Sequence, residues 1–271
     1  QLVADMNAGS VGALLIHGVN PSYSYKDAAG FNSGLGKVGL TVSFADRVDE
    51  TAAGVTYLCP DNHYLESWND SEPKAGIYSL TQPTIQPLFK TRQFQESLLK
   101  WVGSDSNYYD YIKANWAEIH TASSNASMLF NDFFNTALFN GVFEAESEAA
   151  TPEFAGDVNA AAGSIKKVAT GDFELELYVK AGLGDGSQAN NPWLQELPDP
   201  VSRVTWDNYI TMSPKQMEEL GFSRLERGDF MANVAEVTVN GVSVKAPVYP
   251  GPGQKYGTIG LAVGYGRTAA G

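Results

Sequence analysis

The first 60 residues alternate between short apolar runs and more polar stretches. Three apolar runs are typical of buried strands in a parallel sheet: 11–18, 39–46 and 55–60. The stretch 26–38 predicts a weak helix, and Asp49 is positioned to cap a short helix over 50–54. Strands and helices in this order predict an α/β domain with a parallel sheet and right-handed crossovers.

The next hundred residues change character twice. Residues 61–90 show no clear periodicity, and a stretch of that length is typical of a functional loop or one that covers a partner surface. Residues 91–143 carry apolar side chains at helical spacing and predict helices. Residues 144–167 are rich in Ala, Gly and Glu, which indicates a surface segment or a domain boundary. We therefore expect one domain over 1–165, with a helical insert, and a second over 166–271.

The last hundred residues carry strand patterns. Residues 172–180 alternate cleanly and 201–213 less so, and 213–221 has the signature of a short helix capped by Ser213. The strongest local signal is a pair of alternating strands flanking Asn240-Gly241, the residues of a type I′ hairpin turn. Several short strands and one small helix predict a compact β-barrel.

Composition narrows the range of functions. The formal net charge of −13 over 271 residues repels phosphate backbones, so we expect no nucleic-acid partner. One cysteine cannot form an intrachain disulfide or hold an iron–sulfur cluster. No apolar run reaches the roughly 18–20 residues that span a membrane. Because the sequence begins without Met and ends in a glycine-rich turn, we expect a piece of a longer protein.

Three motifs suggest chemistry but fit a structural role better. "GLGKVG" at 34–39 matches a dinucleotide-binding pattern, yet it precedes a strand instead of following one, which indicates a helix end and a turn. Cys59 and His63 could suggest a thiolate–imidazole pair, but a lone cysteine at a strand end is typically a small buried hydrophobic residue. The three histidines, His17, His63 and His120, lack metal-ligand spacing, so we expect structural histidines, no catalytic residue and no metal site.

Two polar regions are better candidates for a ligand site. Loops after parallel strands meet at one sheet edge, where open α/β sheets bind ligands. Polar and acidic side chains follow the three predicted strands: Asn20, Asp46, Asp49, Glu50 and Glu66. The stretch "ANNPWLQELPDPVSRVTWDNY" (189–209) combines amides, Trp rings and carboxylates, which suit a heterocyclic ligand and a polar interface equally well. The alternative for the sheet edge is that Asn20 and Asp49 only form turns and helix caps, and the alternative for 189–209 is a stiff connector between two halves of the fold.

Longer strings resemble the molybdopterin oxidoreductase (DMSO-reductase-like) superfamily over its last two structural domains. They include "GALLIHGVNPSYSY", "LTVSFADRVDETAAGVTYLCPDNHYLES" and the region from "MSPKQMEELGF" to "GTIGLAVGYG". The strings around "CPDNHYLESWND" and "GDGSQANNPWLQELPDPVSRVTWDNY" look more specifically like the iron–sulfur-containing subunit of bacterial alternative complex III, a quinol-oxidising respiratory complex. Residues 144–167 match least.

The resemblance implies a parallel-sheet α/β domain followed by a six-stranded double-psi β-barrel of the pterin-dinucleotide-binding type. It also implies a set of residues lining the former pterin cleft, vestigial in the closer match: Asn20, Glu50, Thr51, Glu66, Asn191, Trp193, Glu196 and Asn208. In that subunit the region holds no molybdenum cofactor. We therefore expect a scaffold that is not catalytic by itself and supports quinol oxidation, with iron–sulfur clusters elsewhere in the chain. The implied partners are that iron–sulfur region and the haem and membrane subunits, on the periplasmic side of the inner membrane.

Two alternatives remain open. The chain could belong to the catalytic subunit of a molybdenum bis-pterin oxidoreductase similar to polysulfide or thiosulfate reductase, whose strand-end loops and 191–193 region would contact pterin dinucleotides. It could also be a stand-alone binder of a small ligand. The family's molybdenum ligand lies upstream of the matched region, and Cys59 stands where the family usually has an aliphatic residue, so no metal role is carried onto Cys59.

Overall fold

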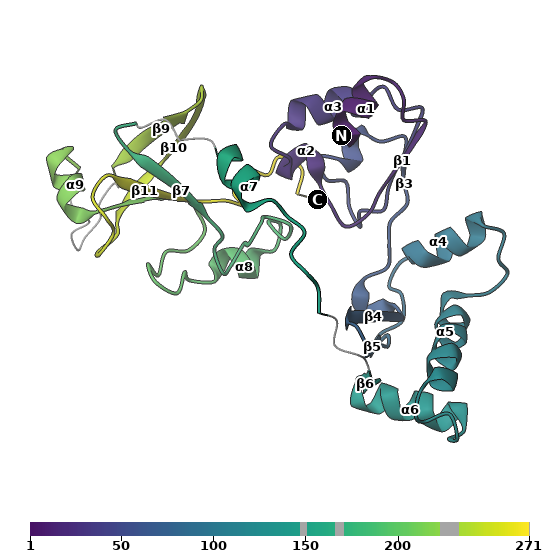
Figure 1. Cartoon of the computed structure of the whole chain (residues 1–271). Coiled ribbons are helices and arrows are strands. Elements are labelled where there is room, and N and C mark those ends of the chain that lie inside the picture. The colour runs from purple at the N-terminus through teal and green to yellow at the C-terminus, as the bar shows by residue number, and fades with distance from the viewer. Residues whose placement is uncertain (147–150, 166–170, 223–232, 271) are drawn as a thin grey trace. The chain divides into compact units, whose positions relative to one another are not determined.

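The chain divides into two compact units, Gln1–Ala155 and Gly156–Gly271 (Figure 1). The computed structural model describes residues 1–146, 151–165, 171–222 and 233–270.

The first unit begins with a three-stranded parallel sheet in the order β1-β2-β3. Its strands are β1 (Ala13–Ile16), β2 (Leu40–Ser43) and β3 (Tyr57–Leu58). The helical segments of this region are α1 (Leu2–Asn7), α2 (Pro21–Ser24), α3 (Ala28–Leu35) and the 3₁₀ turns η1 (Ala52–Gly54) and η2 (Tyr64–Glu66). The predicted parallel sheet is confirmed, and the "GLGKVG" motif spans the end of α3 and the approach to β2, as its context indicated.

One face of this sheet packs against the helices. The buried cluster comprises Met6, Ile16, Phe31, Leu35 and Val38. On the opposite face the prediction of buried strands is confirmed only for the central strand. Val42 of β2 is 5% exposed, whereas Leu15 and Tyr57, its neighbours in register on the two edge strands, are 45% and 58% exposed. An apolar run indicates that a strand has two hydrophobic faces, but only the packing decides which face is covered.

Residues 61–90 contain a hairpin that the sequence pattern did not predict. Strands β4 (Asn69–Lys74) and β5 (Ile77–Thr81) pair antiparallel, and β6 (Val142–Glu144) joins β5 from far along the chain. β4 reads "NDSEPK", which lacks apolar alternation, and its register shifts between Ser71 and Lys74. An edge strand with a proline and an irregularity has the polar, broken pattern of a loop, so periodicity could not identify it.

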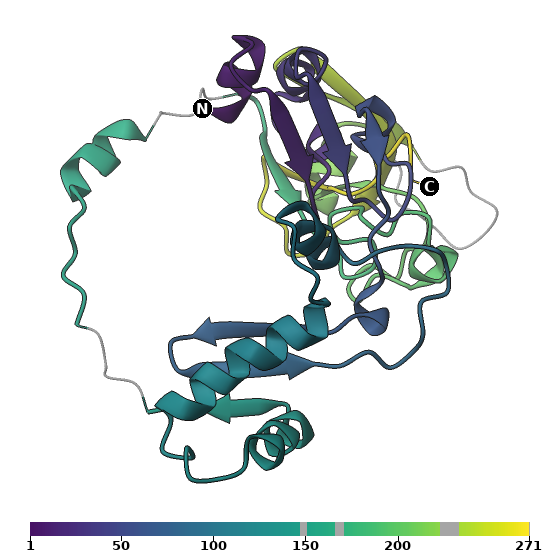
Figure 2. The ribbon, with the colours of Figure 1, turned by 90° about the vertical axis from the view of Figure 1, so that its right-hand side faces the viewer.

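The predicted helices of 91–143 are present as α4 (Phe94–Trp101), α5 (Tyr108–Ala122) and α6 (Phe130–Asn140). Figure 2 shows α5 lying along the β4–β5–β6 sheet. The buried cluster between them is largely aromatic: Leu80, Tyr108, Ile112, Trp116, Phe133, Phe134 and Ala137. This second core explains how a region with such an irregular sequence pattern is held together.

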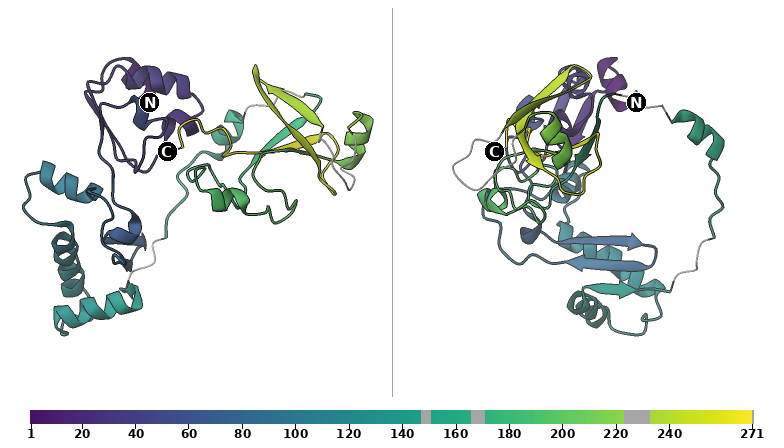
Figure 3. Two further views of the ribbon diagram at one scale, coloured as in Figure 1. Left: turned by 180° about the vertical axis from the view of Figure 1, so that it is seen from behind. Right: turned by 90° about the vertical axis from the view of Figure 1, so that its left-hand side faces the viewer.

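The second unit contains a curled five-stranded mixed sheet in the order β7-β11-β8-β10-β9 (Figure 3). Its strands are β7 (Glu174–Tyr178), β8 (Ile210–Met212), β9 (Val234–Val239), β10 (Val242–Pro250) and β11 (Thr258–Ala262), and its helices are α7 (Val158–Ser164), α8 (Pro192–Glu196) and α9 (Pro214–Glu219). The predicted fold class, a parallel-sheet α/β region followed by a β-barrel-like region, is therefore confirmed. The described residues form an open half-barrel of five strands, where the resemblance implied six.

Local turn chemistry explains where these strands begin and end. Asn240 and Gly241 have φ values of 50° and 81°, as the predicted type I′ turn between β9 and β10 requires. The strand expected over 201–213 is limited to β8 because Arg203 and Trp206 have φ values of 64° and 67°. A left-handed residue cannot continue a pleated strand, and neither residue type signals that conformation in a sequence.

Replacing Ser213 with alanine is expected to lower the free energy of unfolding of the second unit by about 1 kcal/mol. Ser213 is the N-cap of α9, as predicted, and its buried hydroxyl accepts a hydrogen bond from the Gln216 N–H at 3.2 Å. Urea unfolding followed by circular dichroism measures the loss. Ser213→Thr keeps the accepting oxygen and serves as the control; an equal loss in both variants would show that the cap is not the cause.

Candidate functional site

The sheet edge after β1 and β2 brings together three of the residues predicted there. The Asn20 amide group donates to Glu50 Oε2 at 2.7 Å. Asn20 Oδ1 in turn accepts from the hydroxyl and the backbone N–H of the fully buried Thr51, at 2.6 and 3.2 Å. The Thr51 hydroxyl also accepts from the Ser22 N–H at 3.0 Å. Part of the predicted set therefore meets at this edge, and these hydrogen bonds join the loop after β1 to the loop after β2. That these residues line a ligand cleft stays a prediction.

Glu66 holds a different loop. Its two carboxylate oxygens accept hydrogen bonds from the backbone N–H groups of Leu88 and His63, both at 2.9 Å. These bonds, that from Leu88 foremost, lower the pKa of Glu66. His63 completes a reciprocal capping box by accepting from the Leu65 N–H at the start of η2. The position of Glu66 after the third strand was predicted correctly, and its contacts are those of a loop anchor.

The other candidate residues of this unit have structural contacts too. His17 pairs with Asp61 at 2.8 Å and stacks on Phe94, and His120 is buried between backbone carbonyls, so all three histidines are hydrogen-bonded as expected. Asp49 accepts from the Ala52 N–H at 2.7 Å and caps η1. The prediction that Cys59 is a buried residue is wrong. Cys59 is exposed, because β3 ends at Leu58 and the chain leaves the sheet there.

Replacing Asn20 with alanine is expected to destabilise the first unit by about 1–3 kcal/mol, because buried polar groups of Thr51 and the Glu50 carboxylate lose a partner. The measurement is the rate of hydrogen exchange at the backbone amides of β1 and β2 in increasing concentrations of urea, which gives the free energy of unfolding of this region. Asn140→Ala, at an exposed amide, is the matched control and should change stability by less than about 0.5 kcal/mol. Equal effects would mean that the Asn20 network contributes nothing.

In the second unit, the stretch 189–209 forms a helix and a turn. Asn191 caps α8, accepting from the Trp193 and Leu194 N–H groups at 3.1 and 3.4 Å, while Trp193 is 82% exposed. Glu196, at the end of α8, is exposed as well. Asn208 donates to the carbonyl of Ala262 at 2.7 Å, tying the end of the stretch to β11. These contacts are those of a connector between β7 and β8.

A cavity of about 640 Å³ opens beside the last part of this stretch. Tyr209 and Ser202 border it, and their hydroxyls are 2.5 Å apart; Asn191 and Trp193 do not line it. The strand-end segment after β7 contributes Lys180, which the sequence pattern did not single out. Lys180 follows an alternating strand and looks like an ordinary solvated residue, so only the tertiary structure reveals its burial.

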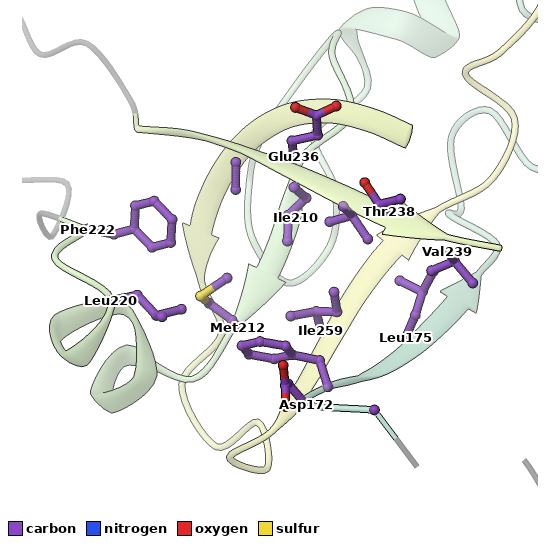
Figure 4. Close-up of a pocket in the computed structure, with 14 residues that line it drawn as sticks. Asp172, Leu175, Ile210, Met212, Leu220, Phe222, Glu236, Thr238, Val239 and Ile259 are labelled. Atoms are coloured by element: carbon purple, nitrogen blue, oxygen red, sulfur yellow. The ribbon is translucent and has the colours of Figure 1, made fainter. Parts of the chain in front are cut away.

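A second cavity, of about 400 Å³, lies inside the curled sheet (Figure 4). Ile210, Met212 and Ile259 point into it from β8 and β11, and all three belong to the buried core of the unit. The carboxylates of Asp172 and Glu236 lie at its edge. Its walls continue the hydrophobic core without a buried polar anchor, so packing accounts for this cavity better than ligand binding does.

Within the described ranges, no group of three or more His, Cys, Asp or Glu side chains is arranged to hold a metal ion. None of the described helices is both long and apolar enough to cross a bilayer.

The structure is similar to that of acetylene hydratase from Pelobacter acetylenicus, with a TM-score of 0.65 and 15% sequence identity. The match covers 97% of this chain and 39% of that chain, so this chain spans about two fifths of the enzyme's length. That enzyme has the molybdopterin oxidoreductase fold, and at this identity the likeness shows a shared fold alone. No family model matches the sequence, and neither does any curated protein.

The fold implies a pterin dinucleotide cofactor, and the candidate residues fit one poorly. Six of the eight already direct polar side-chain atoms at internal partners: Asn20, Glu50, Thr51, Glu66, Asn191 and Asn208. To bind a pterin, the loops that carry them would have to give up hydrogen bonds that define their conformation. No chemical step is therefore derived through that cofactor.

Proposed function

We propose that this chain is a cofactor-free, molybdopterin-oxidoreductase-like scaffold within a subunit of a respiratory electron-transfer complex resembling alternative complex III. In this role it supports quinol oxidation by an iron–sulfur region elsewhere in the chain. It also contacts the haem and membrane subunits on the periplasmic side of the inner membrane. The long strings around 59–70 and 184–209 support the specific assignment, and the likeness to acetylene hydratase supports the fold.

The observation that carries the proposal is the hydrogen-bond network of Asn20, Glu50 and Thr51. In an open α/β sheet this edge is where a ligand binds, and polar side chains there point toward the ligand. Here the amide of Asn20 uses both its donor and its acceptor side on the neighbouring loop. The edge is built to hold two loops together, which is what a scaffold requires.

Elemental analysis of the full-length protein in its native complex tests the proposal. We expect iron without stoichiometric molybdenum, no fluorescent pterin after oxidation, and purification together with haem-bearing and membrane subunits. Protease treatment of spheroplasts should reach the protein, as expected for the periplasmic side. Stoichiometric molybdenum or pterin would contradict the scaffold role, and isolation without haem or membrane subunits would contradict the respiratory complex.

The second candidate function is part of the catalytic subunit of a molybdenum bis-pterin oxidoreductase, similar to polysulfide or thiosulfate reductase. The structural likeness to acetylene hydratase favours it, because that enzyme belongs to the molybdopterin-containing family. The same elemental analysis separates the two, since this candidate requires molybdenum and reduction of a sulfur substrate by the purified protein.

A further inference from the structure

Lys180 is an unusual lysine. It lies two residues beyond β7, where a bridge between Lys180 and Gly184 holds its backbone, and only 7% of the residue is exposed. Lysine is almost never buried to this extent without a carboxylate partner, because removing an ammonium group from water costs several kcal/mol. The burial therefore requires an explanation from its surroundings.

Those surroundings compensate the charge only in part. The ammonium nitrogen lies 3.7 Å from the ring centroid of Tyr209 and 5.0 Å from that of Tyr265, and 3.4 Å from the Tyr265 hydroxyl. An ammonium group has three donors, and this geometry uses one of them weakly. Among the described residues, the ion pairs within 4.0 Å do not include Lys180. Cation–π contacts thus carry much of its stabilisation.

Asp199 is the acidic residue whose charge acts on the Lys180 ammonium group. Its carboxylate oxygen accepts hydrogen bonds from the backbone N–H groups of Val201 and Ser202, both at 2.9 Å, so it is committed to its own turn. Burial raises the pKa of Asp199, but these hydrogen bonds outweigh that effect and the pKa is lowered overall. Asp199 therefore stays ionised at neutral pH and lines the same cavity as Lys180.

We propose that the cavity of about 640 Å³ beside Lys180 binds a small organic monocarboxylate, whose carboxylate pairs with the Lys180 ammonium group. The volume lies within the range of small-molecule sites. The rest of the wall suits an apolar or aromatic body: it includes Tyr178, Tyr249, Pro200, Pro250 and Pro252. One buried cation in a mainly apolar cavity supplies one strong anchor, and the bound carboxylate completes the charge compensation that the protein leaves partial.

Asp199 sets the selectivity of this site. Its negative charge opposes a second negative charge in the cavity, so dicarboxylates and phosphate dianions are disfavoured relative to monocarboxylates. Burial lowers the pKa of Lys180 below its ordinary value, while Asp199 acts in the opposite direction. Because the ligand pairs with the protonated amine, binding is strongest below that pKa and is lost as the pH rises through it.

The test uses the 271-residue chain with benzoate, phenylacetate and phenyl phosphate as probes. Equilibrium dialysis at pH 7 should show saturable binding of the two monocarboxylates at one site and much weaker binding of phenyl phosphate. Lys180→Met should weaken monocarboxylate binding at least about tenfold, corresponding to about 1.4 kcal/mol. Lys113→Met is the matched control, because Lys113 also lies over aromatic rings but outside the cavity. This variant should bind benzoate and phenylacetate as tightly as the unmodified chain does.

Asp199→Asn probes the selectivity directly. The amide oxygen can still accept the turn hydrogen bonds, so the loop is preserved while the charge is removed. Phenyl phosphate should then bind at least about tenfold more tightly, with a smaller gain for benzoate, whose single negative charge Asp199 also repels. Unchanged discrimination would overturn the role of Asp199.

A measurement on the unmodified protein tests the proposal without depending on whether the variants fold. Lys180 should be acetylated by acetic anhydride in the free protein, and benzoate should protect it selectively, as read by peptide mass mapping. Absence of saturable binding by either monocarboxylate, or binding without protection of Lys180, would overturn the proposal.

Discussion

Replacing Trp116 with alanine is expected to destabilise the first unit by about 3–5 kcal/mol. Trp116 is completely buried in the aromatic core between α5, α6 and the β4–β5–β6 sheet. Its ring contacts Phe133 and Phe134, with centroids 6.2 and 5.9 Å away, and its Nε1–H donates to Asp70 at 3.1 Å. Alanine leaves a large cavity and removes the donor that joins α5 to β4.

Native-state hydrogen exchange measures this effect where it arises. Protection of the α5 amides should fall by about 10²–10³-fold or more, because each tenfold change corresponds to about 1.4 kcal/mol. The control is Trp101→Ala on α4: Trp101 is 53% exposed, so its loss should cost about 1 kcal/mol. If both tryptophan variants reduced protection equally, Trp116 would not be the centre of this core.

Replacing Gly186 with alanine is expected to destabilise the second unit by about 2–5 kcal/mol. Gly186 has a φ of +86°, which costs an L-residue about 1–2 kcal/mol. An added Cβ would also lie 2.6 Å from the carbonyl oxygen of Gly264 and 2.9 Å from its Cα, and overpacking of this kind costs about 1–3 kcal/mol more. Both contacts are with backbone, which cannot rotate away as a side chain can.

Gly253→Ala separates the two contributions. Gly253 has nearly the same φ, +85°, but nothing lies within 4 Å of its added Cβ, so only the conformational cost of about 1–2 kcal/mol applies. Protection of the β11 amides against hydrogen exchange reports on both variants. Gly186→Ala should cause the larger loss, and equal losses would mean that the segments at Gly186 and Gly264 can move apart.

The sequence predicted the ends of helices and the turns correctly where one residue type strongly prefers a particular backbone conformation. Ser213 before Pro214 marked the start of α9, and Asn240-Gly241 marked the hairpin between β9 and β10. The β4–β5 hairpin was missed because β4 is polar and sits at a sheet edge, where burial does not select apolar residues. β6 pairs with a strand more than sixty residues earlier, and no local pattern encodes such a partner.

The candidate site was predicted in part. Position after successive parallel strands was enough to bring Asn20 and Glu50 together, because strand ends meet at one edge. The partners of these side chains were not predictable, since an amide group can donate and accept hydrogen bonds to a ligand or to a neighbouring loop equally well. Likewise, the 189–209 stretch contains the residue types of a ligand site, but Asn191 caps a helix and Trp193 points to solvent.

The sequence by itself determined the class of fold, the helices of 91–143, the tight hairpin and the meeting of the strand-end loops. Each of these depends on periodicity or on the backbone preference of one or two residues, which act locally. The tertiary structure alone decided which sheet face is covered, where β6 pairs and why Lys180 is buried. Those features depend on contacts between distant segments, and the free energy of burying a residue is set by its neighbours in space, not by its own type.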